Sequence, residues 1–207
     1  MKRLLIAFGF AAACLTVSVV ARAEPIDALA AIDAPVEYKA DYALTEGEQT
    51  WHGTVVHAPQ RERRDFTTSM GTQALLMRRD SDLIAVIWPD RKWYLSTSLQ
   101  ALVQLGAAHG NLNLDRKKDG VETIGGEPCT RYKVEGAFTG KMWFTKDGIL
   151  MRAAGTMAIG GHPRTISTQL SHLKRGAVDA DDFELPIGYH GIPVSPNLLG
   201  GKDKSEE

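Results

Sequence analysis

Residues 36–44, Val-Glu-Tyr-Lys-Ala-Asp-Tyr-Ala-Leu, alternate apolar and polar side chains along most of their length. Successive side chains of a β-strand point to opposite faces of the sheet, so this pattern predicts a strand with one buried face. Glu46-Gly47-Glu48 follows as a turn, and residues 49–58 are predicted to form the partner strand of a hairpin. The alternation therefore indicates antiparallel β-structure.

The same rhythm of strands and turns continues along most of the chain. Further strands are predicted at residues 61–68, 72–79, 83–88, 92–96, 120–124, 129–135, 137–146, 149–159 and 164–172, and the last structured piece is expected at 183–187. About ten antiparallel strands in one sheet must curl or close. The predicted fold class is therefore mainly β, with a single curved antiparallel sheet that forms an unclosed barrel.

One segment departs from this alternation and predicts the main inserted helix. Residues 98–109 place Leu99, Leu102 and Val103 on one helical face, and Ser96 or Ser98 is suited to cap the first turn. An apolar stripe must be buried against another element. The concave side of the curved sheet is the natural place for it.

The first 23 residues have the layout of a cleavable export signal. Lys2 and Arg3 precede an uncharged apolar run, and residues 21–23, Ala-Arg-Ala, offer small side chains at the cleavage positions. The run is interrupted before it reaches the roughly 18 apolar residues that a membrane span needs. The alternative is a lipoprotein signal that ends at Cys14 and leaves an acylated terminus. We favour cleavage, which places the mature protein in the periplasm.

This interpretation divides the chain into three parts. Residues 1–23 are the signal peptide, residues 24–192 form one domain, and residues 193–207 form a Pro/Gly-rich and then charged tail that we expect to be disordered. Loss of the three positive charges of the signal changes the net charge from −1 to −4. Such a domain is not suited to bind nucleic acid by bulk charge. Cys129 becomes the single cysteine, which predicts a buried and inert thiol.

No set of residues predicts catalysis. The histidines form no metal-binding pair of the His-x-x-x-His or His-Glu-x-x-His type, and Gly-x-Ser-x-Gly is absent. His52 and His57 would point to opposite faces of one strand, and surface or loop positions are favoured for the histidines. We therefore expect no catalytic residue, no metal and no cofactor, and a protein that is not an enzyme.

Two kinds of side chain are candidates for binding. The arginines at 61, 63, 64, 78 and 79 indicate either a basic surface for an acidic partner or lipid head group, or a solvated outer face, which we favour. Inward tryptophans of a curved sheet line an apolar pocket or fill a solid core. The candidate cavity-lining residues are Trp51, Trp88 and Trp143 from the strands, and Leu99, Leu102 and Val103 from the helix.

Six motifs, taken in order, carry a resemblance to known proteins. They are residues 37–42 (Glu-Tyr-Lys-Ala-Asp-Tyr), His57-Ala58-Pro59 with the arginine-rich 61–64, 88–94 (Trp-Pro-Asp-Arg-Lys-Trp-Tyr), 126–134, 143–149 and 183–189. The series resembles an uncharacterised family of exported bacterial proteins whose fold is similar to that of the periplasmic lipoprotein carrier LolA and its outer-membrane receptor LolB. The resemblance implies an unclosed β-barrel with helices in its mouth. In the carriers this cavity accepts acyl chains.

Three functional hypotheses follow. The first is a non-enzymatic periplasmic binding protein that holds an acyl chain or another apolar ligand, related to lipids or lipoproteins, between sheet and helix. The second is an envelope scaffold or partner-sensing protein with a filled core and no ligand, and the third is a hydrolase with an unrecognised site. The expected partners are a lipid or an acylated protein, with peripheral membrane contact and no nucleic acid. The oligomeric state is not determined by the sequence.

Overall fold

The computed structural model describes residues 33–69, 71–101, 114–136, 138–159 and 162–194. These residues form twelve strands: β1 Tyr38–Glu46, β2 Gln49–Ala58, β3 Arg61–Thr68, β4 Gly71–Arg78, β5 Leu83–Trp88, β6 Trp93–Ser98, β7 Leu114–Ile124, β8 Glu127–Gly136, β9 Phe138–Thr145, β10 Leu150–Ile159, β11 His162–Arg175 and β12 His190–Pro193. Two short 3-10 helices, η1 Pro89–Arg91 and η2 Ala180–Phe183, complete the described elements.

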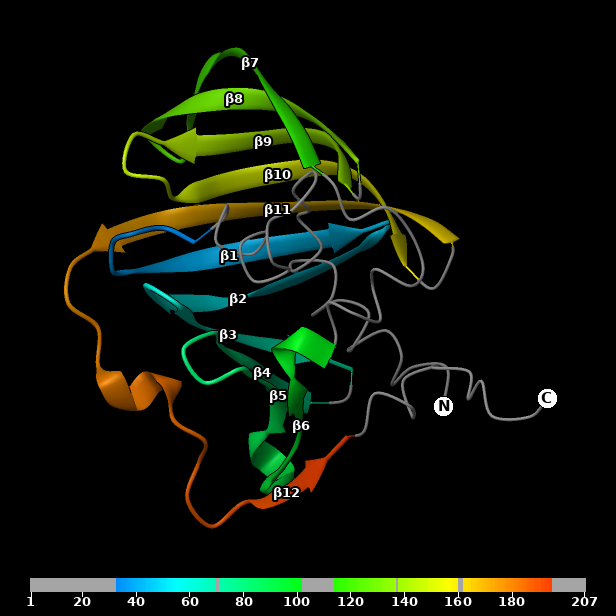
Figure 1. Cartoon of the computed structure of the whole chain (residues 1–207), viewed down its shortest axis with the longest axis vertical. Coiled ribbons are helices and arrows are strands. Elements are labelled where there is room, and N and C mark those ends of the chain that lie inside the picture. Colours follow the sequence, from blue (N-terminus) through cyan, green and yellow to red (C-terminus); the bar gives the residue numbers. More distant parts are fainter. Residues whose placement is uncertain (1–32, 70, 102–113, 137, 160–161, 195–207) are drawn as a thin grey trace.

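All twelve strands belong to one curved sheet (Figure 1). Its strand order is β12-β6-β5-β4-β3-β2-β1-β11-β10-β9-β8-β7, so β1 and β11 join two series of hairpins. Neighbours are antiparallel except at one edge, where β12 lies parallel to β6. The sheet does not close, because β7 and β12 remain as its two edges. The predicted fold class, a curved and unclosed antiparallel sheet, is confirmed.

The strands that the sequence pattern predicts are largely those of the structure. The predicted ranges 49–58, 61–68 and 83–88 coincide with β2, β3 and β5, and β7 begins six residues before the predicted 120–124. The prediction was least accurate after β11. The piece expected at 183–187 is not a strand, and β12 was missed. A four-residue strand with a glycine and a proline has no usable alternation, and β12 is defined only by its pairing with β6.

The alternation of β1 produces the burial that it predicts. Tyr38, Ala40, Tyr42 and Leu44 are buried, whereas Lys39 and Asp41 between them are exposed. The buried face belongs to a cluster that we call the Tyr42 cluster: Ala34, Tyr38, Ala40, Tyr42, Leu44, Val55, Ile124, Cys129, Trp143, Ile149, Met151 and Leu170. Each large apolar side chain buried in this way stabilises the fold by roughly 1.5–3 kcal/mol.

β4 and β5 are buried on both faces, unlike β1. One face of this pair is covered by the segment between β11 and β12, which runs along the outer side of the sheet (Figure 1). Phe183, at the end of η2, is fully buried there in the Phe183 cluster: Ala58, Ala74, Leu76, Ala85, Ile87 and Phe183. Val178, Leu185 and Tyr189 pack around it from the same segment.

The predicted helix begins where the sequence places it. A helical turn at residues 99–101 follows β6, and Ser98 caps it by accepting a hydrogen bond from the Ala101 N–H at 3.2 Å. Asp82, in the β4–β5 turn, strengthens the cap because its carboxylate accepts the Gln100 N–H at 2.9 Å. Residues 102–109 of the predicted helix lie outside the described residues. Within the described part of the chain, no helix is both long and apolar enough to span a membrane.

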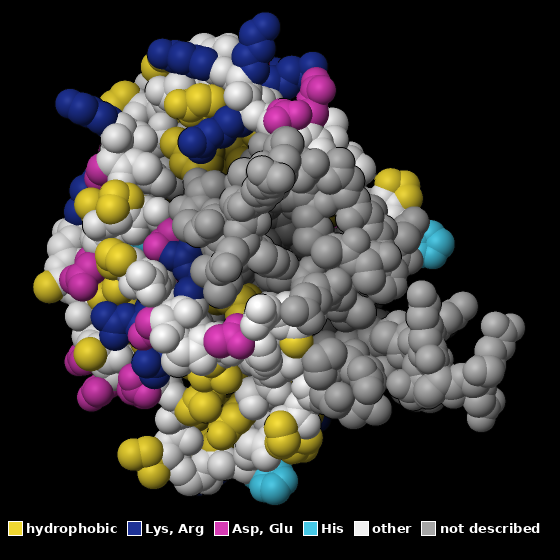
Figure 2. Space-filling model, in the orientation of Figure 1, with side chains coloured by type: hydrophobic (Ala, Val, Ile, Leu, Met, Phe, Trp, Pro, Cys, Tyr) yellow, Lys and Arg dark blue, Asp and Glu magenta, His cyan; other side chains and the backbone are white. Residues whose placement is uncertain are grey.

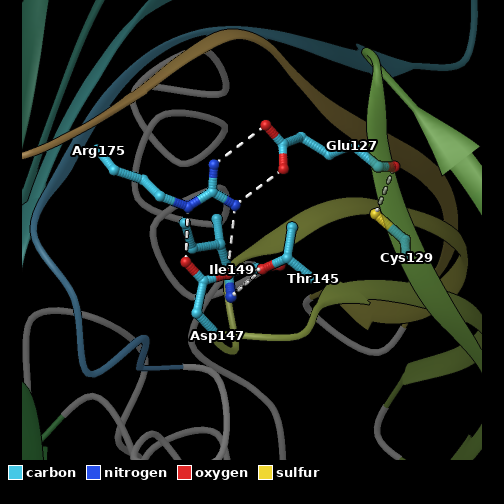
Figure 3. Close-up of polar contacts among 6 residues, drawn as sticks. All are labelled: Glu127, Cys129, Thr145, Asp147, Ile149 and Arg175. Carbon is cyan, nitrogen blue, oxygen red and sulfur yellow. Dashed lines mark hydrogen bonds and ion pairs between the residues drawn. The ribbon is translucent and has the colours of Figure 1, made fainter.

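Arg175, the last residue of β11, joins three strand ends (Figure 3). Its guanidinium donates to both oxygens of Glu127, at 3.0 and 2.9 Å, and to Asp147 at 2.6 Å. Glu127 is the first residue of β8 and Asp147 lies in the β9–β10 turn, so one side chain ties two hairpins to β11. Cys129 is buried beside this contact, as predicted, and burial raises the pKa of its thiol. The predicted cleavage site and most of the predicted tail lie outside the described residues.

Candidate functional site

One continuous group of apolar side chains lies on the inner face of β4, β5 and β6. Cross-strand pairing places Leu75 beside Val86 and Val86 beside Leu95, so their side chains share one face. We call this group the Trp88 cluster: Leu75, Ile84, Val86, Trp88, Leu95 and Leu99, with Phe66, Met77, Trp93 and Val194 packed against it. The rings of Trp88 and Trp93 stack with their centroids 4.5 Å apart. Phe66 also packs against the Tyr42 cluster and so connects the two apolar groups.

Gln73 is a buried polar side chain on this face, which also carries Thr97 opposite Ile84 and, at its border with β3, Arg64 and Glu62. Gln73 pairs across the strands with Phe66 and lies two residues before Leu75, so it shares their face. Its side chain is fully buried, and its Nε2 donates to the Thr68 hydroxyl at 2.9 Å. The sequence reasoning did not single out Gln73. Because alternate residues of a strand share a face, its position two residues before Leu75 could have predicted that Gln73 lies on the same face.

The structure brings together some of the predicted cavity-lining residues. Trp88 and Leu99 are both 2% exposed and belong to the Trp88 cluster, and Trp51 is half-buried against the Tyr42 cluster. Trp143 belongs to the Tyr42 cluster but joins it from the other face of the sheet. Trp143 pairs with Arg152 and Arg152 with Gln169, which pairs with Ala43, so Trp143 lies on the face of Ala43. Trp51 pairs with Leu44, the next residue along β1, and therefore lies on the opposite face. Leu102 and Val103 lie outside the described residues.

Trp143 is held by charged groups. Its Nε1 donates to Glu122 at 2.9 Å, and the Arg152 guanidinium lies 4.9 Å from the centre of its ring. A tryptophan between a carboxylate and a guanidinium is not part of the apolar face of β4–β6. The sequence pattern could not decide this, because it does not show which face of β9 meets which neighbour.

A second polar feature is a buried charged network at the ends of β2 and β3. His57 is 2% exposed, and its Nδ1 and Nε2 face the Glu62 carboxylate at 3.2 Å and the Ala34 carbonyl at 2.9 Å. Both neighbours are acceptors, so the ring satisfies both only when it is protonated. Glu62 also accepts from Arg64 Nε at 2.7 Å. The expectation that the histidines are surface or loop residues is therefore wrong for His57.

The network shifts the pKa values of its members. Burial opposes protonation of His57, but the hydrogen bond and charge of Glu62 outweigh it and raise the pKa of His57. Burial would likewise raise the pKa of Glu62, but the charge of Arg64 and the hydrogen bond to His57 hold it at about 2. Tyr38 stacks on the His57 ring at 4.7 Å, and Asp33 lies 3.5 Å from Nε2 and pairs with Arg79. The network thus fixes the segment before β1 against β2, β3 and β4.

The five candidate arginines divide between two settings. The side chains of Arg64 and Arg79 are 15% and 7% exposed and belong to the buried network, so the favoured interpretation of a solvated face is wrong for them. Arg63 and Arg78 pair with Asp65 and Asp80 near the surface, and Arg61 lies over the Phe183 ring. Among the residues that the structure describes, no group of three metal-binding side chains converges.

Solved structures with a TM-score of 0.5 or more share this fold, and others are more distantly similar. A conserved protein from Thermus thermophilus is 9% identical, with a TM-score of 0.54 over 77% of this chain and 91% of its own. MucB, in its complex with MucA, is 13% identical with a TM-score of 0.50, over 80% of this chain and 60% of MucB. An outer-membrane lipoprotein-sorting protein domain from Vibrio parahaemolyticus is 9% identical with a TM-score of 0.35, over 74% of this chain and 92% of its own.

At these identities the likeness shows the fold alone. The expected fold is confirmed at that level by the likeness to MucB and to the Thermus thermophilus protein. The chain spans about three-fifths of the length of MucB, so it corresponds to part of that protein. No family model matches the chain, and no curated protein matches it.

Proposed function

We propose that the chain is an exported, non-enzymatic binding protein of the periplasm, and that its Trp88 cluster contacts an acyl chain or another apolar ligand. The observation that carries this proposal is the broad apolar face of β4–β6, at whose border Ser98 and Asp82 fix the start of a helix. Binding sites for small molecules combine such apolar walls with few polar groups. Leu102 and Val103, which share the predicted helical face of Leu99, are proposed to line the same site.

The partner proposed for this site is a lipid or an acylated protein, with peripheral contact to a membrane. The signal-like first 23 residues support export, and the fold shared with MucB supports a binding role. A scaffold with a filled core is the second candidate. It is favoured by one observation, the near-complete burial of Trp88 and Leu99. The two candidates differ in whether an apolar ligand displaces part of this packing.

The test is the uptake of a fluorescent acyl-chain probe by the full chain, together with native mass spectrometry of protein isolated from an envelope fraction. Leu75 and Leu76 are adjacent buried leucines on opposite faces of β4, so they form a matched pair. We expect Leu75→Ala and Leu76→Ala each to destabilise the fold by about 2–5 kcal/mol. Only Leu75→Ala, and likewise Leu102→Asn, should weaken probe uptake. A wild-type protein that takes up no probe and carries no lipid would favour the scaffold.

A further inference from the structure

Gln73 carries the one buried side-chain polar atom without a hydrogen-bond partner in the described part of the chain. The atom is its carbonyl oxygen, Oε1. The amide is assigned with its NH2 group toward Thr68: Gln73 Nε2 donates to the Thr68 hydroxyl at 2.9 Å, and that hydroxyl lies 3.4 Å from the Gly71 carbonyl oxygen. The oxygen is thus left as an acceptor with no donor.

The position of this oxygen is informative. Gln73 shares its face with Phe66 and Leu75, which belong to or pack against the Trp88 cluster. An unpaired acceptor among apolar side chains is unfavourable, because water no longer solvates it, and native structures contain few of them. A leucine or methionine would fill a similar volume without this penalty. The glutamine is therefore explained if a bound molecule supplies the missing donor.

We propose that the ligand of the Trp88 cluster is a long-chain amphiphile whose head donates a hydrogen bond to Gln73 Oε1 from a neutral hydroxyl or amide N–H. This inference rests on the proposed function and specifies the class of ligand. An ionised carboxylate is a poor fit, because it offers only acceptors to Gln73 Oε1, and the cation on this face, Arg64 opposite Leu75, is already paired with Glu62. Two sources share the required chemistry: a lipid with a free hydroxyl, and an acyl chain joined to a protein through an amide.

The experiment compares three ligands of equal chain length in displacing a fluorescent acyl-chain probe from the full chain. A fatty alcohol and a secondary fatty amide carry a donor, whereas a fatty methyl ester carries only acceptors. We expect the better of the two donors to bind about tenfold more tightly than the ester, as one buried hydrogen bond allows. The tighter of the two identifies the source: the alcohol a lipid hydroxyl, and the amide an acylated protein.

Gln73→Leu tests the residue itself. It removes the acceptor at similar volume, so we expect it to fold with an unchanged or higher melting temperature, to bind the ester at least as well, and to lose the tenfold preference. Gln169→Leu, at an exposed position of β11, is the matched control and should retain the preference.

The outcomes separate this inference from the proposed function. If none of the three ligands displaces the probe, both fail. If all three bind the wild type equally, the site binds apolar chains and the role of Gln73 is overturned. Preference for the ester would show that the amide presents its NH2 group and would also overturn it. If Gln73→Leu does not fold, the preference of the wild type still decides the question.

Discussion

The β4–β5 pair and the β7–β8 hairpin are both antiparallel strands of one sheet, yet they are covered in opposite ways. From Gln73 to Leu76 every side chain of β4 is buried, with the Trp88 cluster on one face and the Phe183 cluster on the other. In β7, residues 115–119 are all exposed. Figure 2 shows the corresponding gathering of Lys and Arg side chains over the β7–β9 end of the molecule.

The difference shows that two things decide whether a strand is buried: its position in the sheet, and whether a segment from elsewhere in the chain packs on it. β4 lies inside the sheet and receives the segment around Phe183 from more than 100 residues later in the chain. β7 is an edge strand, and its charges discourage pairing with another chain. The central pair therefore holds most of the stability in this comparison, and the edge hairpin tolerates polar groups.

The largest expected loss of stability comes from weakening the contact by which the segment between β11 and β12 covers the outer face of β4 and β5. Phe183→Ala removes a fully buried ring from the Phe183 cluster and should destabilise the fold by about 3–5 kcal/mol. Tyr132→Ala, at a half-buried ring of β8 that packs on Phe144, is the control and should have less than half this effect. Urea unfolding of both variants measures the difference. Equal losses would show that the two regions are covered equally well.

The second prediction concerns the dependence of stability on pH. The charged side chains are buried at β2–β3 but exposed at β7–β8, so the titration of the buried groups should dominate this dependence. The pKa of Glu62 is lowered to about 2, so its contribution is present above its ordinary pKa and is lost as the pH falls toward 2. The loss should be roughly 3 kcal/mol. The pKa of His57 is raised, so its contribution is present below the ordinary value and is lost as the pH rises through the shifted pKa.

Stability should thus be greatest between the ordinary pKa of a glutamate and that of a histidine. Unfolding free energies measured across this range check the prediction. Glu62→Gln should flatten the acid side of the profile and His57→Gln the alkaline side. Glu135→Gln breaks an exposed pair with Lys133 on β8 and should change the acid side far less than Glu62→Gln, because solvent screens that pair. A profile that does not respond to Glu62→Gln would refute a stabilising role for the network.

A smaller effect is expected where the β7–β8 and β9–β10 hairpins are tied to β11. Arg175→Ala removes the charge-assisted bonds to Glu127 and Asp147 and should destabilise the fold by about 1 kcal/mol, since the side chains are partly exposed. Arg175→Lys should recover part of this, because it keeps the charge but loses the two-pronged contact. Arg164→Ala breaks a single exposed pair with Glu46 and serves as the control, with an effect near zero. Thermal unfolding at constant pH distinguishes them.

The smallest effect has the opposite sign. Lys117, Lys133 and Lys141 are directly opposite one another across β7, β8 and β9. Like charges placed in this way are unfavourable, so Lys117→Glu should stabilise the fold by about 0.2–1 kcal/mol at low salt. Lys118→Glu is the control, because Lys118 faces Tyr132 and not another lysine. The gain should shrink at high salt, and a gain that persists would point to a cause other than charge.

Local pattern was sufficient for much of the fold. The alternation in residues 36–44 and the turn at Gly47 predict β1, β2 and their pairing. Ser98 predicts the start of the helix, although the contribution of Asp82 from another turn could not be foreseen. Pairing also contained a signal that was not used: the hairpin register puts His57 opposite the buried Tyr38, which excludes a surface position for that ring.

The sequence by itself determined the class of structure, because a side-chain period of two and the chemistry of tight turns act within a few residues. Only the tertiary structure decided which strands are buried on both faces, that Trp143 lies on the opposite face from Trp51, and that Gln73 keeps an unpaired oxygen in an apolar face. These outcomes depend on contacts between residues far apart in the chain. Local periodicity shows that a side chain is inward on its own strand, but it does not identify the distant segment that covers it.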